Sequence, residues 1–421
     1  MLIYNVFPLL AGPFPKWDVH FDRAAGLGFD WIFVNPIHRP GRSGSLYSVA
    51  DHFDFNPLFL DSAAGAAPAE QVRAMTAAAR SRGMRVMIDL VINHCAADSV
   101  LVREHPEWLV WKDGALVHPG CDENGKRVVW TDLAQLDYRN SRDVAGLEGY
   151  MTRVTDFLVG LGFTGFRCDA AYQVPRDVWR RLIEHVRAAH PEVVFVAETL
   201  GCTPDRTRET AEAGFHAVFN SGKWWDFQSP WLMEQYDLVR ETCGSIGFPE
   251  SHDTPRLAEE THGNFAAMKQ RYLFAALFSE GVLMPIGFEF GFRRRLHVVS
   301  TRPEQWEDTG WDMSKFIRRT NAIKRDNPVF QSDCPTHIVS NGNPSVLVMW
   351  KGSSRTRDEA LVILNKDVHN YQHFHAESLR RLVQSGAPLK CVSPENALPF
   401  VPEPFTYELR PGEGIVLVAK R

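Results

Sequence analysis

Short apolar runs alternate with amphipathic segments from residue 1 to about residue 328. The runs begin near residues 3, 31, 84, 163, 193, 217, 245 and 282, and Met84–Ile92 is apolar at nearly every position. Such continuous apolar character is typical of parallel strands buried on both faces. Strands of this kind, with helical segments between most of them, predict a (β/α)8 barrel, also called a TIM barrel, of the α/β class. A doubly wound open sheet is the alternative, but no GxGxxG motif follows the first strand.

Helical periodicity fills the intervals between these runs. The segment 70–82 places Val72, Met75 and Ala79 on one face and ends at Gly83. Apolar residues between 147 and 161 also step by four, three, four and three positions. These spacings predict amphipathic helices that pack against the barrel.

Two stretches depart from the alternation and indicate further domains. Residues 95–142 are too long for a strand-to-helix loop and predict a small subdomain inserted after the third strand. Beyond residue 328, apolar runs such as Ser345–Trp350 and Gly414–Ala419 are separated by Asn, Gly, Ser and Pro. We therefore expect a catalytic barrel at 1–94 and 143–328, and an all-β sandwich domain at 329–421.

Charge and composition exclude several classes of partner. Lys and Arg number 46 against 51 Asp and Glu, for a formal net charge of −5, which gives no basic footprint for nucleic acid. No apolar run approaches the roughly 20 residues needed to cross a bilayer. The N-terminus has no basic region before Lys16, which argues against a secretory signal.

The cysteine pattern favours a reducing compartment. The chain has 7 Cys, an odd number, and none forms a CxxC pair. The spacing fits neither a zinc ribbon nor a disulfide scaffold. We therefore expect reduced cysteines in a cytoplasmic protein.

Polar residues gather where the predicted strands end. The third strand closes with Asp89-Leu-Val-Ile-Asn93-His94, and the fourth with Gly165-Phe-Arg167-Cys-Asp169. Glu198 ends the fifth strand, and Glu250-Ser-His252-Asp253 ends the seventh. Each feature alone is typical of a helix cap or a surface loop. Together they indicate an active site, because barrel enzymes build their sites at the C-terminal ends of the strands.

The spacing of two carboxylates indicates a particular chemistry. Asp169 and Glu198 would end adjacent strands, whose axes lie about 4.8 Å apart. Retaining glycosidases need carboxyl groups about 5–5.5 Å apart, whereas inverting enzymes need roughly 6.5–9.5 Å. Arg167 should share a barrel face with Asp169 and keep it ionised as a nucleophile. Glu198 follows an apolar run, so desolvation should raise its pKa as a general acid/base requires.

With these motifs in place, the sequence resembles the α-amylase family, glycoside hydrolase family 13. The resemblance includes Tyr4–Pro8, Gly28–Ile37, Tyr47–Asp51, the four strand ends and Met284–Gly291. It implies that Asp169 is the nucleophile, Glu198 the acid/base and Asp253 the third carboxylate, which holds sugar hydroxyls in the transition state. The implied substrate-binding residues are Tyr47 under the sugar ring, His94 and His252 as hydrogen-bond partners of the sugar, and Arg167 and Asp89 as supports. Arg256 is a further substrate-binding candidate, as a cation near the leaving-group side.

The sequence departs from the commonest α-amylases at several positions. Tyr172-Gln173 stand where Lys-His is usual, Ser251 replaces Asn, and the motif Gln135-Leu-Asp137 is degenerate. Asn93 and Asp137 would be the residual calcium ligands, whereas Ca²⁺ takes six to eight oxygens. We therefore expect no cofactor, and regard a calcium site as doubtful.

Three functions are compatible with this pattern. The first is a retaining hydrolase or transglycosidase acting on α-glucosidic linkages. The second is a maltosyltransferase that uses maltose 1-phosphate, because Glu104-His-Pro-Glu-Trp108 and Cys168–Tyr172 resemble bacterial maltosyltransferase cores. That function would need an anion site, for which Arg176, Lys223 and Arg256 are candidates, although each is also typical of a solvated surface charge. The third is an inactive barrel used for binding, which is disfavoured because all three carboxylates are present.

Aromatic residues supply the last candidates. The chain has 12 Trp, 27 Phe and 9 Tyr, or 11% of its residues. Most of the Phe residues are expected in the core. The candidate sugar-stacking platforms are Trp108, Trp111 and Trp130 in the insertion, and Trp224 and Trp225 after the sixth strand.

Overall fold

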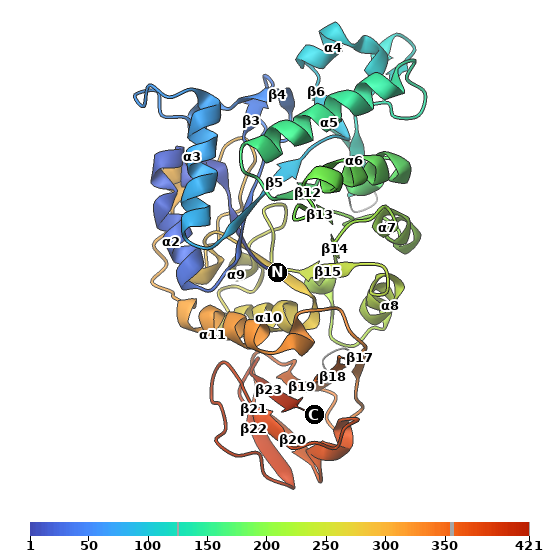
Figure 1. Ribbon diagram of the computed structural model, residues 1–421. Helices are drawn as coiled ribbons and strands as arrows, with labels where there is room; N and C mark the ends of the chain where they lie inside the picture. Colours follow the sequence, from blue (N-terminus) through green and yellow to red (C-terminus); the bar gives the residue numbers. More distant parts are fainter. Residues whose placement is uncertain (124–125, 354–357, 421) are drawn as a thin grey trace.

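The computed structural model describes residues 1–123, 126–353 and 358–420. Eight parallel strands close into a barrel, in the order β1-β16-β15-β14-β13-β12-β5-β2 (Figure 1). They are β1 Leu2–Val6, β2 Trp31–Val34, β5 Arg85–Leu90, β12 Gly165–Cys168, β13 Val194–Ala197, β14 Ala217–Phe219, β15 Gly244–Gly247 and β16 Gly281–Pro285. The predicted (β/α)8 barrel is confirmed, and every strand begins within about two residues of its expected position.

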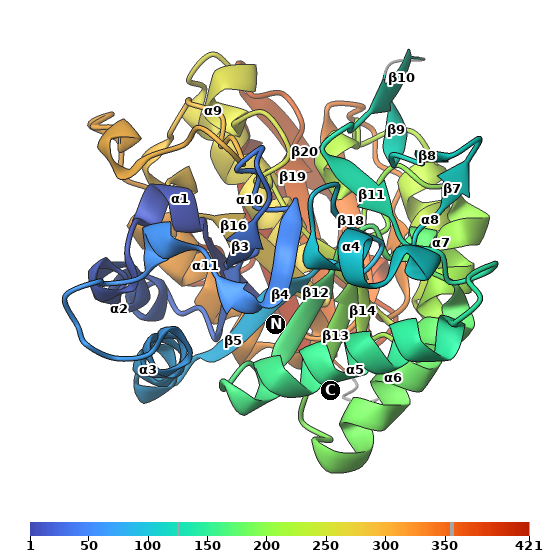
Figure 2. The ribbon, with the colours of Figure 1, turned by 90° about the horizontal axis from the view of Figure 1, so that it is seen from above.

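Helices surround the barrel on its outer face (Figures 1 and 2). The longer ones are α2 Asp18–Gly26, α3 Pro68–Ser81, α5 Val144–Gly160, α6 Arg176–Ala189, α7 Pro204–Ala211, α8 Trp231–Val239, α10 Phe265–Phe278 and α11 Ser314–Asp326. Short helices are α1 Pro8–Ala11, α4 Val100–Glu104 and α9 Leu257–Glu260. The predicted stop of α3 is real: Gly83 has φ +79°, a left-handed conformation that glycine adopts without steric cost.

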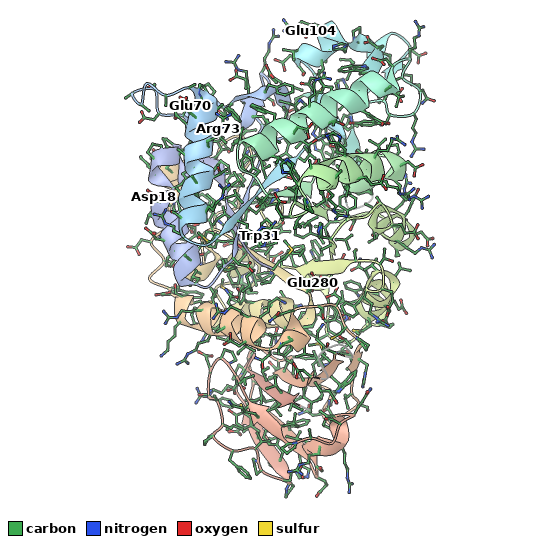
Figure 3. All side chains as sticks on the ribbon, in the orientation of Figure 1. Asp18, Trp31, Glu70, Arg73, Glu104 and Glu280 are labelled. Atoms are coloured by element: carbon green, nitrogen blue, oxygen red, sulfur yellow. The ribbon has the colours of Figure 1, made fainter. Side chains whose placement is uncertain are left out.

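Strand alternation sorts the side chains of the barrel into two sets. One set fills the barrel interior, and the other faces the surrounding helices. The interior cluster includes Trp31, which is labelled in Figure 3. Its ring centroid lies 4.1 Å from the Arg85 guanidinium. The whole interior cluster is Ile3, Trp31, Phe33, Met87, Val194, Val196, Ala217, Phe219, Ile246, Phe248 and Leu283. This alternation decides which residues reach the mouth of the barrel.

Two insertions lie between β2 and α5. The first is an antiparallel hairpin of β3 His38–Pro40 and β4 Val49–Phe55, which the sequence pattern did not predict. The second is the predicted subdomain after β5, built from β6 His94–Ala96, α4, β7 Trp111–Lys112, β8 Ala115–Leu116, β9 Gly120–Glu123, β10 Lys126–Val129 and β11 Leu133–Gln135. It projects from one side of the barrel (Figures 1 and 2).

The C-terminal region is all-β, as predicted, and forms two sheets. A five-stranded sheet has the order β17-β18-β19-β23-β21, and β20 pairs with β22. The strands are β17 Thr336–Ile338, β18 Val346–Gly352, β19 Asp358–Asn365, β20 Gln372–Ala376, β21 Leu389–Cys391, β22 Phe405–Leu409 and β23 Gly414–Lys420. The predicted domain boundaries themselves stay predictions.

The larger C-terminal sheet packs on both faces. Along β18, Leu347 and Met349 belong to the core shared with the barrel helices, whereas Val348 and Trp350 belong to a second core. The sheet is therefore a middle layer between the barrel and the β20–β22 pair. Lys351 is buried at the barrel side and donates hydrogen bonds to the carbonyl of Phe278 (2.7 Å) and to the Tyr236 hydroxyl (3.1 Å).

In the described ranges, no helix has both the length and the apolar character that crossing a bilayer requires. Six described cysteines, at positions 95, 168, 202, 243, 334 and 391, are free thiols. The side chain of Cys121 lies outside the described residues.

Candidate active site

The candidate site continues the barrel interior beyond its apolar layers. Asp89 follows Met87 by two residues, and Glu198 follows Val196 by two, so both share the inward direction of the interior cluster. Arg167 pairs in register with Asp89 across β12 and β5. Apolar side chains thus fill the barrel, and ionisable side chains replace them at the C-terminal ends of the strands.

The nucleophile and acid/base candidates follow adjacent strands in register. Cys168 on β12 pairs with Ala197 on β13, and Asp169 and Glu198 are the next residues along each strand. Backbone hydrogen bonds continue past the strands, because the Glu198 N–H donates to the carbonyl of Cys168 at 3.0 Å. The two carboxylates therefore emerge from neighbouring backbone positions, as the retaining spacing requires.

Arg167 links the carboxylates into one network. Its Nη1 lies 2.7 Å from Asp89 Oδ1 and 2.5 Å from Asp169 Oδ1, and its Nη2 lies 3.9 Å from Asp253 Oδ2. Burial raises the pKa of Asp89 to about 6, against the opposing effect of Arg167. The guanidinium therefore holds the Asp169 carboxylate in place by a charge-assisted hydrogen bond.

Glu198 has the environment of a proton donor. Burial raises its pKa to about 7, and the negative charges of Asp169 and Asp253 act in the same direction, whereas Arg167 opposes them. The N–H groups of Ala170 and Leu200 donate to its two carboxyl oxygens at 2.9 and 2.7 Å. The side chain is thus fixed in position and can exchange a proton near neutral pH.

Asp253 lies at the edge of this network and remains ionised. Desolvation by its surroundings opposes ionisation, but His252, Arg167 and Arg295 outweigh it and lower the pKa of Asp253 to about 2. Its Oδ2 lies 3.0 Å from His252 Nε2. More than half of its side chain, 57%, is accessible, so this carboxylate can reach a ligand.

Tyr47 connects the hairpin to the strand ends. Its hydroxyl donates to Asp89 Oδ2 at 2.6 Å, and it also lies 2.5 Å from His252 Nε2. The Tyr47 and His252 rings stack at 5.7 Å with an interplanar angle of 3°. His94 Nε2 contacts the Tyr47 carbonyl at 3.0 Å. Both histidines therefore hold the tyrosine at the mouth of the barrel.

Two asparagines complete the support and were not predicted. Asn35 donates to the Tyr47 hydroxyl at 3.0 Å, and Asn5 donates to Asn35 Oδ1 at 2.9 Å; both are fully buried. Asn35 follows Phe33 by two residues, and Asn5 follows Ile3 by two, so each faces inward. A buried amide at an inward position of a strand end is the sequence signal that could have identified them.

Three predicted cations are already paired. Arg256 is almost completely buried and donates to Glu250 Oε1 at 2.7 Å, to the Ile286 carbonyl at 2.9 Å and to the Arg294 carbonyl at 3.2 Å. Arg256 was expected to bind substrate, but the structure uses it to brace the loop after β15. Lys223 is also buried, 2.6 Å from Glu260. Arg176 pairs with Glu212 at 2.7 Å.

These contacts correct two expectations. Lys223 and Arg256 are not solvated surface charges, because both side chains are buried and each is paired with a carboxylate, Glu260 at the surface and Glu250 in the interior. Arg176, Lys223 and Arg256 each form an ion pair with a carboxylate. Their geometry therefore does not support the anion site for which they were candidates.

The two calcium candidates differ in how their side-chain oxygens are bonded. Asp137 Oδ1 accepts hydrogen bonds from the N–H groups of Arg139 (3.0 Å) and Asn140 (2.7 Å), so it caps a turn. Asn93 Oδ1 is buried without a hydrogen-bond partner in the described structure. These two side-chain oxygens alone are fewer than the six to eight oxygens that Ca²⁺ takes, and the expectation of no calcium stays a prediction. Among the described residues, no cluster of three or more His, Cys, Asp or Glu is placed to hold a metal.

The candidate tryptophan platforms separate by exposure. Trp108 and Trp225 are buried at 3% and 2% exposure, so they are core residues. Trp130 is half-buried. Trp111 and Trp224 are exposed at 46% and 51%. Only exposed rings can offer a face to a ligand, which leaves Trp111 and Trp224 as the stronger candidates.

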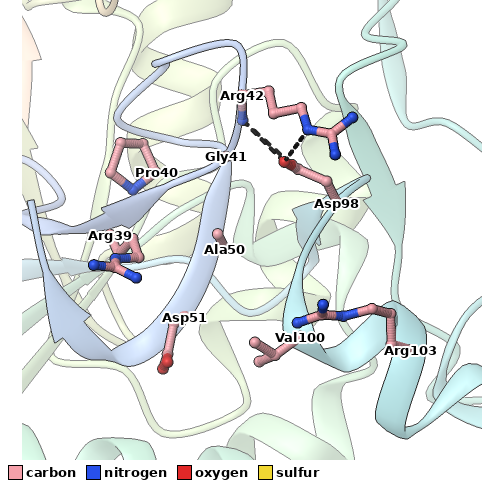
Figure 4. Close-up of a pocket in the computed structure, with 9 residues that line it drawn as sticks. All are labelled: Arg39, Pro40, Gly41, Arg42, Ala50, Asp51, Asp98, Val100 and Arg103. Carbon is pink, nitrogen blue, oxygen red and sulfur yellow. Dashed lines mark hydrogen bonds and ion pairs between the residues drawn. The ribbon is translucent and has the colours of Figure 1, made fainter.

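A cavity of about 340 Å³ lies where the β3–β4 hairpin meets the inserted subdomain (Figure 4). Its lining is Arg39, Pro40, Gly41, Arg42, Ala50, Asp51, Asp98, Val100 and Arg103. Arg39 pairs with Asp54 at 2.9 Å, and Arg42 pairs with Asp98 at 3.5 Å. These exposed charges are largely compensated, and the three catalytic candidates do not line this cavity.

Comparison with known proteins agrees with the fold. A family model described as the glucanotransferase domain of glycogen debranching enzyme matches residues 1–110. An α-1,4-glucan:maltose-1-phosphate maltosyltransferase from Burkholderia pseudomallei is 26% identical over 85% of this chain and 32% of its own length. A second, from Arcanobacterium haemolyticum, is 30% identical over 61% of this chain and 38% of its own. The chain thus spans about a third of the length of these two relatives.

Solved structures show the same fold over the whole chain. An α-amylase from H. orenii has a TM-score of 0.79 at 16% identity and covers 100% of this chain and 99% of its own. A maltogenic α-amylase from Thermotoga neapolitana has a TM-score of 0.76 at 20% identity, with coverage of 100% and 99%.

The fold is the (β/α)8 barrel of the α-amylase structures. The predicted resemblance to the α-amylase family is confirmed, and so is the likeness to bacterial maltosyltransferase cores. The proteins named above are all enzymes, in agreement with the predicted enzyme class.

Proposed function

We propose that this chain is a retaining enzyme that acts on α-glucosidic linkages of oligosaccharides or glucans. The observation that carries the proposal is the Arg167 network, which fixes Asp169 beside a Glu198 whose pKa is raised to about 7. One fixed carboxylate and one proton-holding carboxyl on adjacent strands are the two groups that double displacement needs.

In the first step, an Asp169 oxygen attacks the anomeric carbon while Glu198 gives its proton to the departing glycosidic oxygen. The C–O bond to the leaving group breaks as the bond to Asp169 forms, so a glycosyl-enzyme ester results. In the second step, Glu198 removes a proton from a water or a sugar hydroxyl, whose oxygen displaces Asp169. Two inversions at the same carbon retain the α configuration.

The remaining residues orient the sugar. Asp253 is ionised and accessible, so it can accept hydrogen bonds from sugar hydroxyls as positive charge develops at the ring. Tyr47 is held from several directions and can support the apolar face of the ring. An inactive binding barrel is less well supported, because such a protein has no need of a carboxyl whose pKa is raised to about 7.

The test is turnover of an activated aryl α-glucoside by two variants. Asp169→Ala and Glu198→Gln should each reduce kcat by at least about 10³-fold, because each removes a group that takes part in bond breaking. Glu234→Gln, on the exposed side of α8, is the matched control and should retain wild-type activity. NMR of the first product should show the α anomer. Full activity of either site variant, or a β product, would exclude the proposal.

A maltosyltransferase that uses maltose 1-phosphate is the second candidate. It is supported by two relatives with this activity, which are 26% and 30% identical to this chain. Incubation with maltooligosaccharides, sucrose, trehalose and maltose 1-phosphate, with and without acceptor, distinguishes the two. Release of inorganic phosphate with elongation of the acceptor would favour the transferase.

We also propose that the enzyme is cytoplasmic. The free thiols described above support this location, because structural disulfides are typical of oxidising compartments.

A further inference from the structure

Trp224 is held so that its ring projects from the barrel. It ends the short 3₁₀ helix Gly222–Trp224, directly after β14. Its neighbours are both anchored inward: Lys223 is ion-paired with Glu260, and the Trp225 indole donates to the Ser229 carbonyl at 2.7 Å. The backbone between two buried side chains has little freedom. Trp224, which stands between them, is 51% exposed.

The exposed ring rests on the last apolar layer of the barrel interior. Trp224 and Phe248 meet edge to face, with ring centroids 5.9 Å apart. Phe248 belongs to the interior cluster and precedes Glu250 and His252 along the same strand end. Trp224 therefore lies at the mouth of the barrel, at the same end as the catalytic candidates.

The barrel order places this ring on the acid/base side of the site. Strand β14 lies between β13, which carries Glu198, and β15, which leads to Asp253. Tyr47 comes from the hairpin after β2, which is separated from β14 by β5, β12 and β13. Glu198 protonates the departing oxygen, so the leaving group, and later the acceptor, lies toward Glu198 and away from the sugar held by Tyr47.

We propose that Trp224 is a stacking platform for the glucosyl units of the leaving group and the acceptor. The C–H groups of a glucose ring form an apolar face, which suits the electron-rich face of an indole. An exposed, rigidly held aromatic ring at the mouth of a site loses little conformational freedom on binding. The proposal rests on the function proposed above and adds a binding role for the acceptor.

This role has a consequence for the fate of the glycosyl-enzyme. Water needs no platform, whereas a sugar acceptor must be held with its hydroxyl facing the anomeric carbon. Loss of the platform should therefore weaken transfer to sugar more than hydrolysis.

The first experiment measures binding without turnover. Maltoheptaose is titrated into Glu198→Gln and into Glu198→Gln/Trp224→Ala by calorimetry. We expect the second substitution to raise Kd about tenfold, the effect of losing one good aromatic contact. Glu198→Gln/Trp224→Phe should recover most of the affinity. Glu198→Gln/Tyr371→Ala, which removes a 57% exposed aromatic ring in the C-terminal region, should bind like Glu198→Gln alone.

The second experiment measures partition in the active enzyme. An aryl α-glucoside serves as donor and maltotetraose as acceptor. Trp224→Ala should need about tenfold more acceptor than wild type for half-maximal transfer, and should lower the ratio of transfer to hydrolysis at a fixed acceptor concentration. Equal acceptor dependence in Trp224→Ala and wild type would overturn the proposal, as would unchanged maltoheptaose binding. If wild type turns over no glycoside but binding still depends on Trp224, the proposed reaction is wrong and the platform stands.

Discussion

Glu198 sets the pH range in which the proposed reaction can proceed. A general acid must carry its proton when the leaving group departs, and burial raises the pKa of this carboxyl to about 7. The protonated form therefore predominates below pH 7 and is lost above it. We expect kcat/KM for a maltooligosaccharide to fall about tenfold per pH unit above pH 7. A profile that stays flat to about pH 9 would contradict this assignment.

Single residues were predicted best where the strand pattern fixes their direction. Asp89, Arg167, Asp169 and Glu198 could be placed because alternation along a short strand leaves two directions, and one of them is the barrel interior. The partners of Lys223 and Arg256 could not be predicted in this way. Whether a cation is solvated or buried depends on a carboxylate brought to it by tertiary folding, such as Glu260, which lies 37 residues after Lys223.

At the scale of elements, the β3–β4 hairpin was the least predictable part of the site. β3 has only three residues, and β4 (Val49–Phe55) contains Asp51, His52 and Asp54, so apolar periodicity is weak. The hairpin is stable because it docks on other elements, which a local pattern does not encode. Tyr47 could be assigned from family resemblance, but its bonds to Asn35 and Asp89 became visible only in the fold.

The docking of this hairpin depends on close contact at Gly41. A Cβ atom there would lie 2.4 Å from Asp98 Oδ1 and 2.7 Å from the Cβ of Ala96 on β6. Gly41→Ala should therefore push the hairpin from the inserted subdomain, move the Tyr47 hydroxyl away from Asp89, and lower kcat/KM by about 10–100-fold. Steady-state kinetics on the aryl α-glucoside measures the loss.

Gly149, within α5, provides the control for this substitution. A Cβ there meets its nearest atom, Arg153 Nη1, at 3.8 Å, an ordinary contact. Gly149→Ala should keep wild-type kinetics and raise the free energy of unfolding by about 0.5–1 kcal/mol, because alanine favours the helix. Wild-type kinetics in Gly41→Ala would show that the hairpin does not need this contact.

At the scale of the whole molecule, the alternation of strands and helices was sufficient to predict the barrel. Each barrel strand is buried on both faces, and helices such as α3 and α6 are buried on one, so the two periodicities remain visible in the sequence. The helix α10, which is buried continuously over 272–278, is an exception. The sequence pattern did not show that the barrel and the C-terminal sheet share one hydrophobic core. β18 is buried at all seven positions, and its composition does not show which neighbour covers each face.

The shared core predicts that the C-terminal sheet is needed for the barrel to fold. Ending the chain after Asn327 removes Leu347, Met349 and Val416 from the core that they form with the barrel helices. We expect the shortened chain to aggregate or to lose its near-ultraviolet circular dichroism, because a large apolar surface becomes exposed. The intact chain should unfold in urea as a single transition, whichever probe is used. A soluble, cooperatively folded 1–327 fragment would contradict this.

The middle position of that sheet also determines how the chain can be recombined with others. A chimera joined between α11 and β17 would pack a sheet from another protein against α8 and α10. The residue that takes the place of Lys351 would then have to form its hydrogen bonds to Tyr236 and to the Phe278 carbonyl. Exchanging the sheet alone would require matched changes in both helices, whereas exchanging β20 and β22 disturbs only the outer face. For design, the barrel and the five-stranded sheet should therefore come from the same parent, and the segments to exchange are those that form the β20–β22 pair.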